Sequence, residues 1–193
     1  MDSESQFEIA RQESEAKALK KFRKLFDPKN AERPELQFFG TQVVLFNTGY
    51  GDDGAKQEQK KILTDLAGLM LPAVAGALPA NERLVCHADA KSIAPSVDVC
   101  GPSSYGFVTD PEDGVLYHEA QVDTESVDAD PYFVTGLLAH HTACALIPTL
   151  ERMATERSLQ LVGDETQVAD VITLVWLYPE KVVENPLPPG PLT

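Results

Sequence analysis

Cysteine is scarce in this chain, and basic residues are outnumbered almost two to one by acidic ones. The 193 residues include three cysteines, an odd number that is too small for a disulfide framework, so we expect reduced thiols in the cytoplasm. Lys and Arg number 16 against 30 Asp and Glu, which leaves a net charge of −14. Because contacts to phosphate groups need Lys and Arg, this deficit argues against direct nucleic-acid binding.

Long uninterrupted hydrophobic runs are also missing. The longest apolar stretch, residues 66–80, is about fifteen residues long, too short to span a bilayer, and Pro72 and Pro79 interrupt it. The N-terminus lacks the basic and apolar regions of a signal peptide. The sequence therefore predicts a cytoplasmic protein without membrane contact, and its 43% hydrophobic content is enough for a folded core.

Hydrophobic periodicity predicts both helices and strands. A row of apolar residues that includes Phe7, Leu19 and Phe22 predicts a helix over residues 3–26 that docks on its own domain. A Pro-Glu-Asp-Gly turn between two apolar arms predicts a hairpin. The predicted strands are residues 42–47, 83–87, 106–110, 115–122, 159–162 and 168–178; residues 101–106 are expected to form a turn.

The longest predicted element is a helix over about residues 130–157. Asp130 is a suitable N-cap residue, and Pro131 suits the first helical position. Two neighbouring apolar rows follow, which indicates that this helix is covered on more than one side. We therefore predict an α+β fold with one domain, in which a mixed or largely antiparallel sheet packs on this long central helix.

The predicted organisation has three parts. Residues 1–34 form a helical N-terminal extension, residues 35–184 form the α+β core domain, and residues 185–193 form a Pro-rich C-terminal tail. The tail holds four prolines in nine residues. Because proline cannot donate to a ladder of hydrogen bonds, the tail cannot join the interior of a sheet.

Negative charge is concentrated between residues 88 and 130, which hold ten acids and one base, Lys91. This pattern predicts a non-catalytic protein-protein interaction protein without a cofactor: an inhibitor or immunity-type protein, or an assembly subunit of a larger particle. Its expected partner is another protein with a cationic surface, and self-association is also compatible with the sequence. The predicted partner-binding residues are Asp110, Glu112, Asp113, Asp123, Glu125, Asp128, Asp130 and Tyr132.

The alternative prediction is a metal-dependent enzyme. His140 and Cys144 lie four residues apart and face one way on the predicted central helix, a spacing that can give two ligands to zinc. Cys86 and His87, at the end of a predicted strand, are the other candidate ligands. Against this alternative, the chain contains no C-x-x-C or H-E-x-x-H motif, and cysteine is commonly a small buried residue.

A third, weaker alternative is nucleotide binding at Gly49–Gly54. These residues match G-x-G-x-x-G between a predicted strand and a predicted helix, where glycines let the backbone approach a pyrophosphate. Asp52 and Asp53 lie inside the motif and would repel phosphates. A flexible turn explains the same residues.

Overall fold

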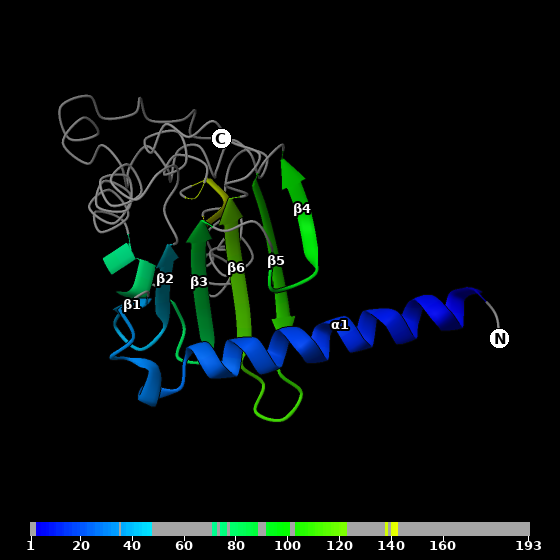
Figure 1. Ribbon diagram of the computed structural model, residues 1–193, viewed down its shortest axis with the longest axis horizontal. Helices are drawn as coiled ribbons and strands as arrows, with labels where there is room; N and C mark the ends of the chain where they lie inside the picture. Colours follow the sequence, from blue (N-terminus) through cyan, green and yellow to red (C-terminus); the bar gives the residue numbers. More distant parts are fainter. Residues whose placement is uncertain are drawn as a thin grey trace, which may run out of the picture.

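The computed structural model describes residues 3–34, 36–47, 71–72, 74–76, 78–88, 92–100, 103–122, 138 and 140–142. Six strands form one sheet in the order β1-β2-β3-β6-β5-β4 (Figure 1). Strands β2, β3 and β6 run parallel, and the remaining pairings are antiparallel. The mixed sheet and its helices confirm the predicted α+β class. The elements are α1 (Ser3–Leu25), η1 (Pro28–Asn30), β1 (Leu36–Phe39), β2 (Val43–Asn47), β3 (Glu82–Ala88), β4 (Ser96–Cys100), β5 (Ser103–Thr109) and β6 (Leu116–Val122).

Most local predictions agree with this structure, but one predicted turn is wrong in part and two strands were not predicted. Helix α1, strands β2 and β3, and the β5–β6 hairpin lie where the periodicity predicted them. The turn predicted over residues 101–106 is wrong from Ser103 onward, because Ser103 and Ser104 pair with β6 and so begin β5. Strands β1 and β4 were not predicted; their four and five residues are too few to show a clear period. None of the described helices combines the length and apolar character needed to cross a membrane.

The helix described against the sheet is the N-terminal α1. The long helix predicted over residues 130–157 lies outside the described residues apart from Leu138 and residues 140–142, which are helical. That helix, the strands predicted over residues 159–162 and 168–178, and the Pro-rich tail therefore stay predictions.

One face of the sheet is covered by the second half of α1. Phe22 is fully buried, and its ring stacks on Tyr117 of β6 with ring centroids 5.2 Å apart and an angle of 3° between the planes. Ala18 of α1 packs in the same cluster, together with Val44 of β2 and Val85 of β3. Part of the predicted N-terminal extension thus belongs to the core of the sheet domain, as the docked-helix prediction required.

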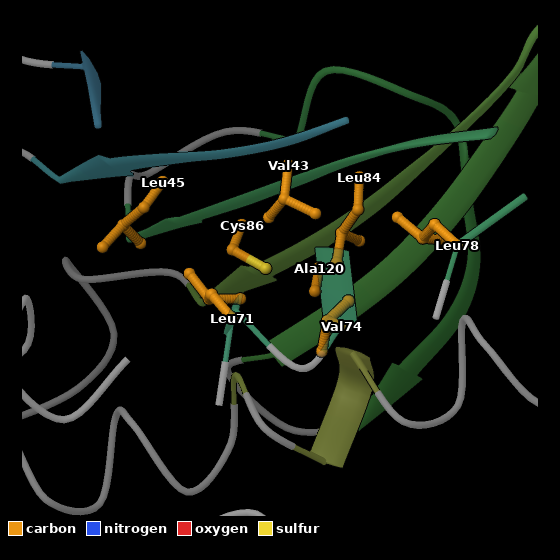
Figure 2. Close-up of a cluster of buried hydrophobic side chains, with 8 residues drawn as sticks. All are labelled: Val43, Leu45, Leu71, Val74, Leu78, Leu84, Cys86 and Ala120. Carbon is orange, nitrogen blue, oxygen red and sulfur yellow. The ribbon is translucent and has the colours of Figure 1, made fainter. Parts of the chain in front are cut away.

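The opposite face carries a second apolar cluster (Figure 2). Val43 and Leu45 of β2 point into it, while Val44, between them, belongs to the cluster under α1. Strand β2 is therefore covered on both faces, as its continuous apolar sequence predicted. The second cluster consists of Val43, Leu45, Leu71, Val74, Leu78, Leu84, Cys86 and Ala120.

Asp110 ties α1 to the β5–β6 hairpin. Its carboxylate is fully buried and accepts two hydrogen bonds of 2.6 Å from Nε and Nη2 of Arg23. It also accepts the backbone N–H of Glu112 at 3.0 Å. The Arg23 hydrogen bonds, more than any other contact, hold the pKa of Asp110 below its usual value of 3.8.

Replacing Asp110 with asparagine is expected to lower the free energy of unfolding by about 2 kcal/mol at pH 7, because one guanidinium N–H then faces an amide N–H. A carboxylate whose pKa is lowered on folding stabilises the protein above its unfolded pKa and loses this effect as the pH falls through its folded pKa. Urea denaturation of wild type and D110N should therefore converge toward acid pH.

The matched control for D110N is Asp113→Asn in the same turn, since Asp113 is exposed and, among the described residues, accepts only the backbone N–H of Val115. Its effect should stay within about 1 kcal/mol, as for an exposed capping contact. Equal losses in D110N and D113N would contradict a specific role for the Arg23 pair.

Candidate functional site

Two consecutive residues of β6 form buried pairs with β3 on opposite faces of the sheet. His118 Nε2 lies 2.9 Å from Oε2 of Glu82, and His87 Nε2 lies 2.5 Å from Oε1 of Glu119. Because successive side chains of a strand point to opposite faces, the two pairs cannot share one site. The parallel register of β3 and β6, with Cys86 opposite Ala120, brings each pair together.

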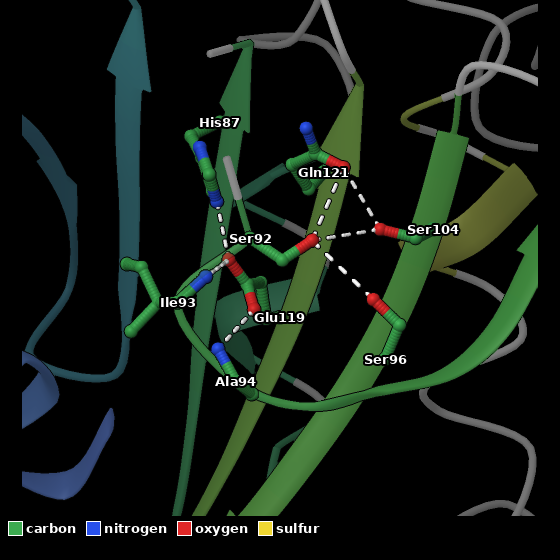
Figure 3. Close-up of polar contacts among 8 residues, drawn as sticks. All are labelled: His87, Ser92, Ile93, Ala94, Ser96, Ser104, Glu119 and Gln121. Atoms are coloured by element: carbon green, nitrogen blue, oxygen red, sulfur yellow. Dashed lines mark hydrogen bonds and ion pairs between the residues drawn. The ribbon is translucent and has the colours of Figure 1, made fainter. Parts of the chain in front are cut away.

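Glu119 anchors the pair on the α1 face (Figure 3). Its Oε1 also accepts the backbone N–H of Ile93 at 2.6 Å, and its Oε2 accepts that of Ala94 at 2.7 Å. A carboxylate can only accept hydrogen bonds. The contact with Glu119 therefore places a proton on Nε2 of His87, just as Ile93 and Ala94 donate their backbone N–H groups. Glu119 therefore fixes both the orientation of the imidazole ring and the position of the loop that follows β3.

This loop lies against the sheet because Gly106 of β5 has no side chain. A Cβ atom at Gly106 would lie 2.5 Å from the backbone oxygen of Pro95. Beside this contact, Ser92 Oγ lies 3.0 Å from Ser104 Oγ and donates to Gln121 Oε1 at 3.3 Å (Figure 3). The absence of a Cβ at residue 106 thus lets the loop bring its amides to Glu119.

The ring of His87 lines a pocket of about 340 Å³ between α1, β2 and the loop after β3. Nδ1 of His87 is buried and has no hydrogen-bond partner among the described residues. The pocket combines three cationic side chains with three apolar ones. Its described lining residues are Lys21, Lys24, Leu25, Arg33, Phe46, His87 and Ile93.

This arrangement can bind a negatively charged group. With Nε2–H donated to Glu119, Nδ1 accepts a hydrogen bond when the ring is neutral and donates one when it is protonated. Lys21 and Lys24 are three residues apart and so lie on one side of α1. Phe46 forms an apolar wall, with its ring centroid 5.7 Å from that of His87.

The predicted acidic surface is only partly described. Asp110 is buried against Arg23, so it has no surface to offer a partner. Glu112 and Asp113 are exposed on the hairpin turn, and Oε2 of Glu112 lies 3.0 Å from Nη2 of Arg23. The other predicted partner-binding residues lie outside the described residues: Asp123, Glu125, Asp128, Asp130 and Tyr132.

The structure describes three of the four predicted metal ligands and does not bring them together. Cys86 and His87 lie on opposite faces of β3. Cys86 Sγ lies 3.3 Å from Oγ1 of Thr142, beside the helical residues that include His140. Cys144 is outside the described residues, within which no three His, Cys, Asp or Glu side chains are grouped to hold a metal.

The chemistry of Cys86 and His141 is that of buried polar groups. Burial raises the pKa of the Cys86 thiol to about 12, which keeps the sulfur protonated at neutral pH. His141 Nε2 lies 2.6 Å from Oγ of Ser103, and both side chains are buried. The Gly49–Gly54 motif lies outside the described residues.

One feature of the sequence bears on the His87 site. Glu119 and Gln121 alternate along β6 with apolar residues and share the face of Tyr117. Polar residues that alternate with apolar ones on a strand usually indicate a solvent-exposed face, so this pattern does not by itself predict that Glu119 and Gln121 are buried. The partners of Glu119 and Gln121 depend on which strands pair with β6, and this cannot be read from the sequence of β6 alone.

Comparisons with known proteins assign no function. No protein-family model, curated protein or solved structure matches this chain. Any functional proposal therefore rests on the geometry of the described residues.

Proposed function

We propose that this protein binds a small anionic organic molecule in the pocket above His87. The ligand carries a carboxylate or phosphate group on an apolar body. Two observations carry the proposal: the His87 residue lines a pocket with three cationic side chains, and its buried Nδ1 atom has no partner among the described residues. An unpaired buried polar atom costs about 1–3 kcal/mol, and a hydrogen bond between the ring and a ligand oxygen removes this cost.

The charge distribution supports an anion rather than a cation as the bound group. The whole chain carries a net charge of −14, yet the described lining of this pocket contains no Asp or Glu. Local cations in a low-dielectric concavity raise the concentration of an anion there even when the total charge is negative. The proposal thus places the anionic group beside Lys21, Lys24 and Arg33.

The size and the walls of the pocket favour a small ligand with an apolar part. Its volume of about 340 Å³ lies near the lower end of the range for ligand pockets, roughly 300–1,000 Å³. Leu25, Phe46 and Ile93 supply apolar surface opposite the cations. An aromatic carboxylate matches both halves of this lining, so benzoate is a suitable probe for comparison with inorganic phosphate.

The test is isothermal titration calorimetry with benzoate and with inorganic phosphate. Wild type is expected to bind at least one of them, and Lys24→Glu to weaken this binding by about tenfold or more, since reversing a charge beside the anion costs at least 1.4 kcal/mol. Lys17→Glu is the matched control, because Lys17 is an exposed lysine of α1 outside the described lining.

A second pair of variants tests His87 itself. His87→Gln should abolish binding of the probe, while His118→Gln, which removes the buried histidine of the opposite face, should leave affinity unchanged. Thermal melting of both variants reports whether they fold. Failure of wild type to bind either probe, or equal weakening by K24E and K17E, would refute the proposal.

A second candidate function is the acidic protein-protein interaction protein predicted from residues 110–130. Its support is the exposed β5–β6 turn, in which the Glu112 side chain is 76% exposed. Charge complementarity with a cationic surface would then set the rate of encounter. Neutralising Glu112 and Asp113 together should slow association with a polylysine peptide and flatten its salt dependence, whereas an unchanged rate removes this turn from the proposed surface.

A further inference from the structure

The outer side of the second half of α1 consists of lysine alone. Phe22 marks the side of this half that is buried against the sheet. At about 100° per residue, the residues between 16 and 25 that lie within an arc of roughly 100° on the far side of the helix are all lysines. All four of them are exposed: Lys17, Lys20, Lys21 and Lys24. We term this surface the lysine face.

The stability of the helix does not account for the lysine face. Its neighbouring members are three or four residues apart, and like charges at these spacings destabilise a helix. None of the four forms an ion pair within the described part of the chain, where the ion pairs of α1 belong to Arg11 and Arg23.

Two general reasons for surface lysines also fall short here. The favourable interaction of cations with the helix dipole is limited to the last turn, so it applies to Lys24 and not to the three lysines before it. Solubility improves with the size of the net charge, whereas these cations reduce the size of a net charge of −14. A bound anionic partner accounts for both the position and the repulsion of the four lysines.

We propose that the lysine face binds a short acidic segment of a partner protein. Carboxylates placed along the face relieve the repulsion among the lysines and complement their charge. The face is about 10 Å long, since Lys17 and Lys24 are separated by two turns of a helix that rises about 1.5 Å per residue. An extended segment of about four residues, at roughly 3.3 Å each, covers this length.

The surroundings of the face favour an acidic peptide over other polyanions. Glu13 precedes Lys17 on the same side of α1, and Asp27 follows the helix, so a long nucleic-acid strand would meet carboxylates at both ends of the face. The net charge of −14 adds to this repulsion. A membrane surface is disfavoured because the face contains no apolar residue to enter the lipid, and the exposed Phe7 and Ile9 lie in the acidic first half of α1.

This inference does not rest on the ligand proposed for the His87 pocket. Lys21 and Lys24 belong both to the lysine face and to the lining of that pocket, whereas Lys17 and Lys20 lie outside the described lining. Reversing the charge of Lys17 or Lys20 therefore tests the acidic partner and leaves the pocket lining intact. Failure of one proposal is thus distinguishable from failure of the other.

The test is the fluorescence anisotropy of a labelled decaglutamate peptide titrated with the full chain. Wild type is expected to bind the peptide, and to bind it more weakly as the salt concentration rises. Lys17→Glu and Lys20→Glu should each weaken binding about threefold or more, and the K17E/K20E double variant about tenfold or more, because exposed charge contacts are weak singly and here act together. Lys29→Glu is the matched control, since it reverses an exposed lysine outside α1.

The melting temperature gives an independent readout. K20E replaces the repulsion of Lys20 by Lys17 and Lys24 with attraction, so its melting temperature should equal or exceed that of wild type while its peptide binding falls. A lower melting temperature of K20E would mean that Lys20 supports the fold, which removes the reason for a partner.

Three binding results would overturn the proposal. One is the failure of wild type to bind decaglutamate, and another is equal weakening by K17E, K20E and K29E. The third is equal or tighter binding of an oligothymidine of the same length, because the partner would then be a nucleic acid.

Discussion

Replacing Phe22 with alanine is expected to lower the free energy of unfolding by about 3–5 kcal/mol. Phe22 is fully buried between α1 and the sheet, and its ring stacks on Tyr117. Truncation removes the transfer free energy of the ring and leaves a cavity that Val44 and Val85 of the sheet cannot fill without moving the strands. Because this cluster joins α1 to all three parallel strands, β2, β3 and β6, the loss of the Phe22 ring weakens the whole domain.

Guanidinium chloride denaturation followed by circular dichroism measures this loss. Phe7→Ala is the matched control, since it makes the same substitution in the same helix at a side chain that is 72% exposed. We expect the effect of F7A on the isolated chain to be below about 1 kcal/mol. Similar losses for F22A and F7A would mean that α1 does not dock on the sheet through Phe22.

Replacing Glu119 with glutamine should cost about 3 kcal/mol or more, although the two side chains have nearly the same shape. Glu119 is buried and accepts three hydrogen bonds, from His87 and from the backbone amides of Ile93 and Ala94. Glutamine has one acceptor oxygen, so its amide N–H₂ group faces at least one of these donors. A buried donor is then left without an acceptor.

One further readout and one control variant test this interpretation. Nitrogen-15 NMR of the imidazole should show the proton of His87 on Nε2 in wild type, as donation to Glu119 requires. Glu112→Gln is the control, because the Glu112 side chain is 76% exposed and its substitution should change stability by less than about 1 kcal/mol. A proton on Nδ1 alone in wild type would contradict the assignment of Glu119 as the group that orients His87.

The outcome at Asp110 shows how far charge patterns can be read without a structure. The sequence places Asp110 among ten acids and predicts a surface for a cationic partner. In the structure its cationic partner is Arg23 of the same chain, 87 residues earlier. The number of acids in a segment limits the surface charge it can carry, but only the fold decides which of them are already paired.

Residues close together in the chain were enough to predict the local elements: α1, the strands β2 and β3, and the hairpin around Gly114, where the backbone φ of +72° favours glycine. These follow from hydrophobic period and turn chemistry within a few residues. The contact between His87 and Glu119, beside a pocket lined by lysines of α1, follows only from the packing of the folded chain. This contact depends on the register between β3 and β6, which are about thirty residues apart in the chain. The hydrophobic pattern of neither strand contains information about that register.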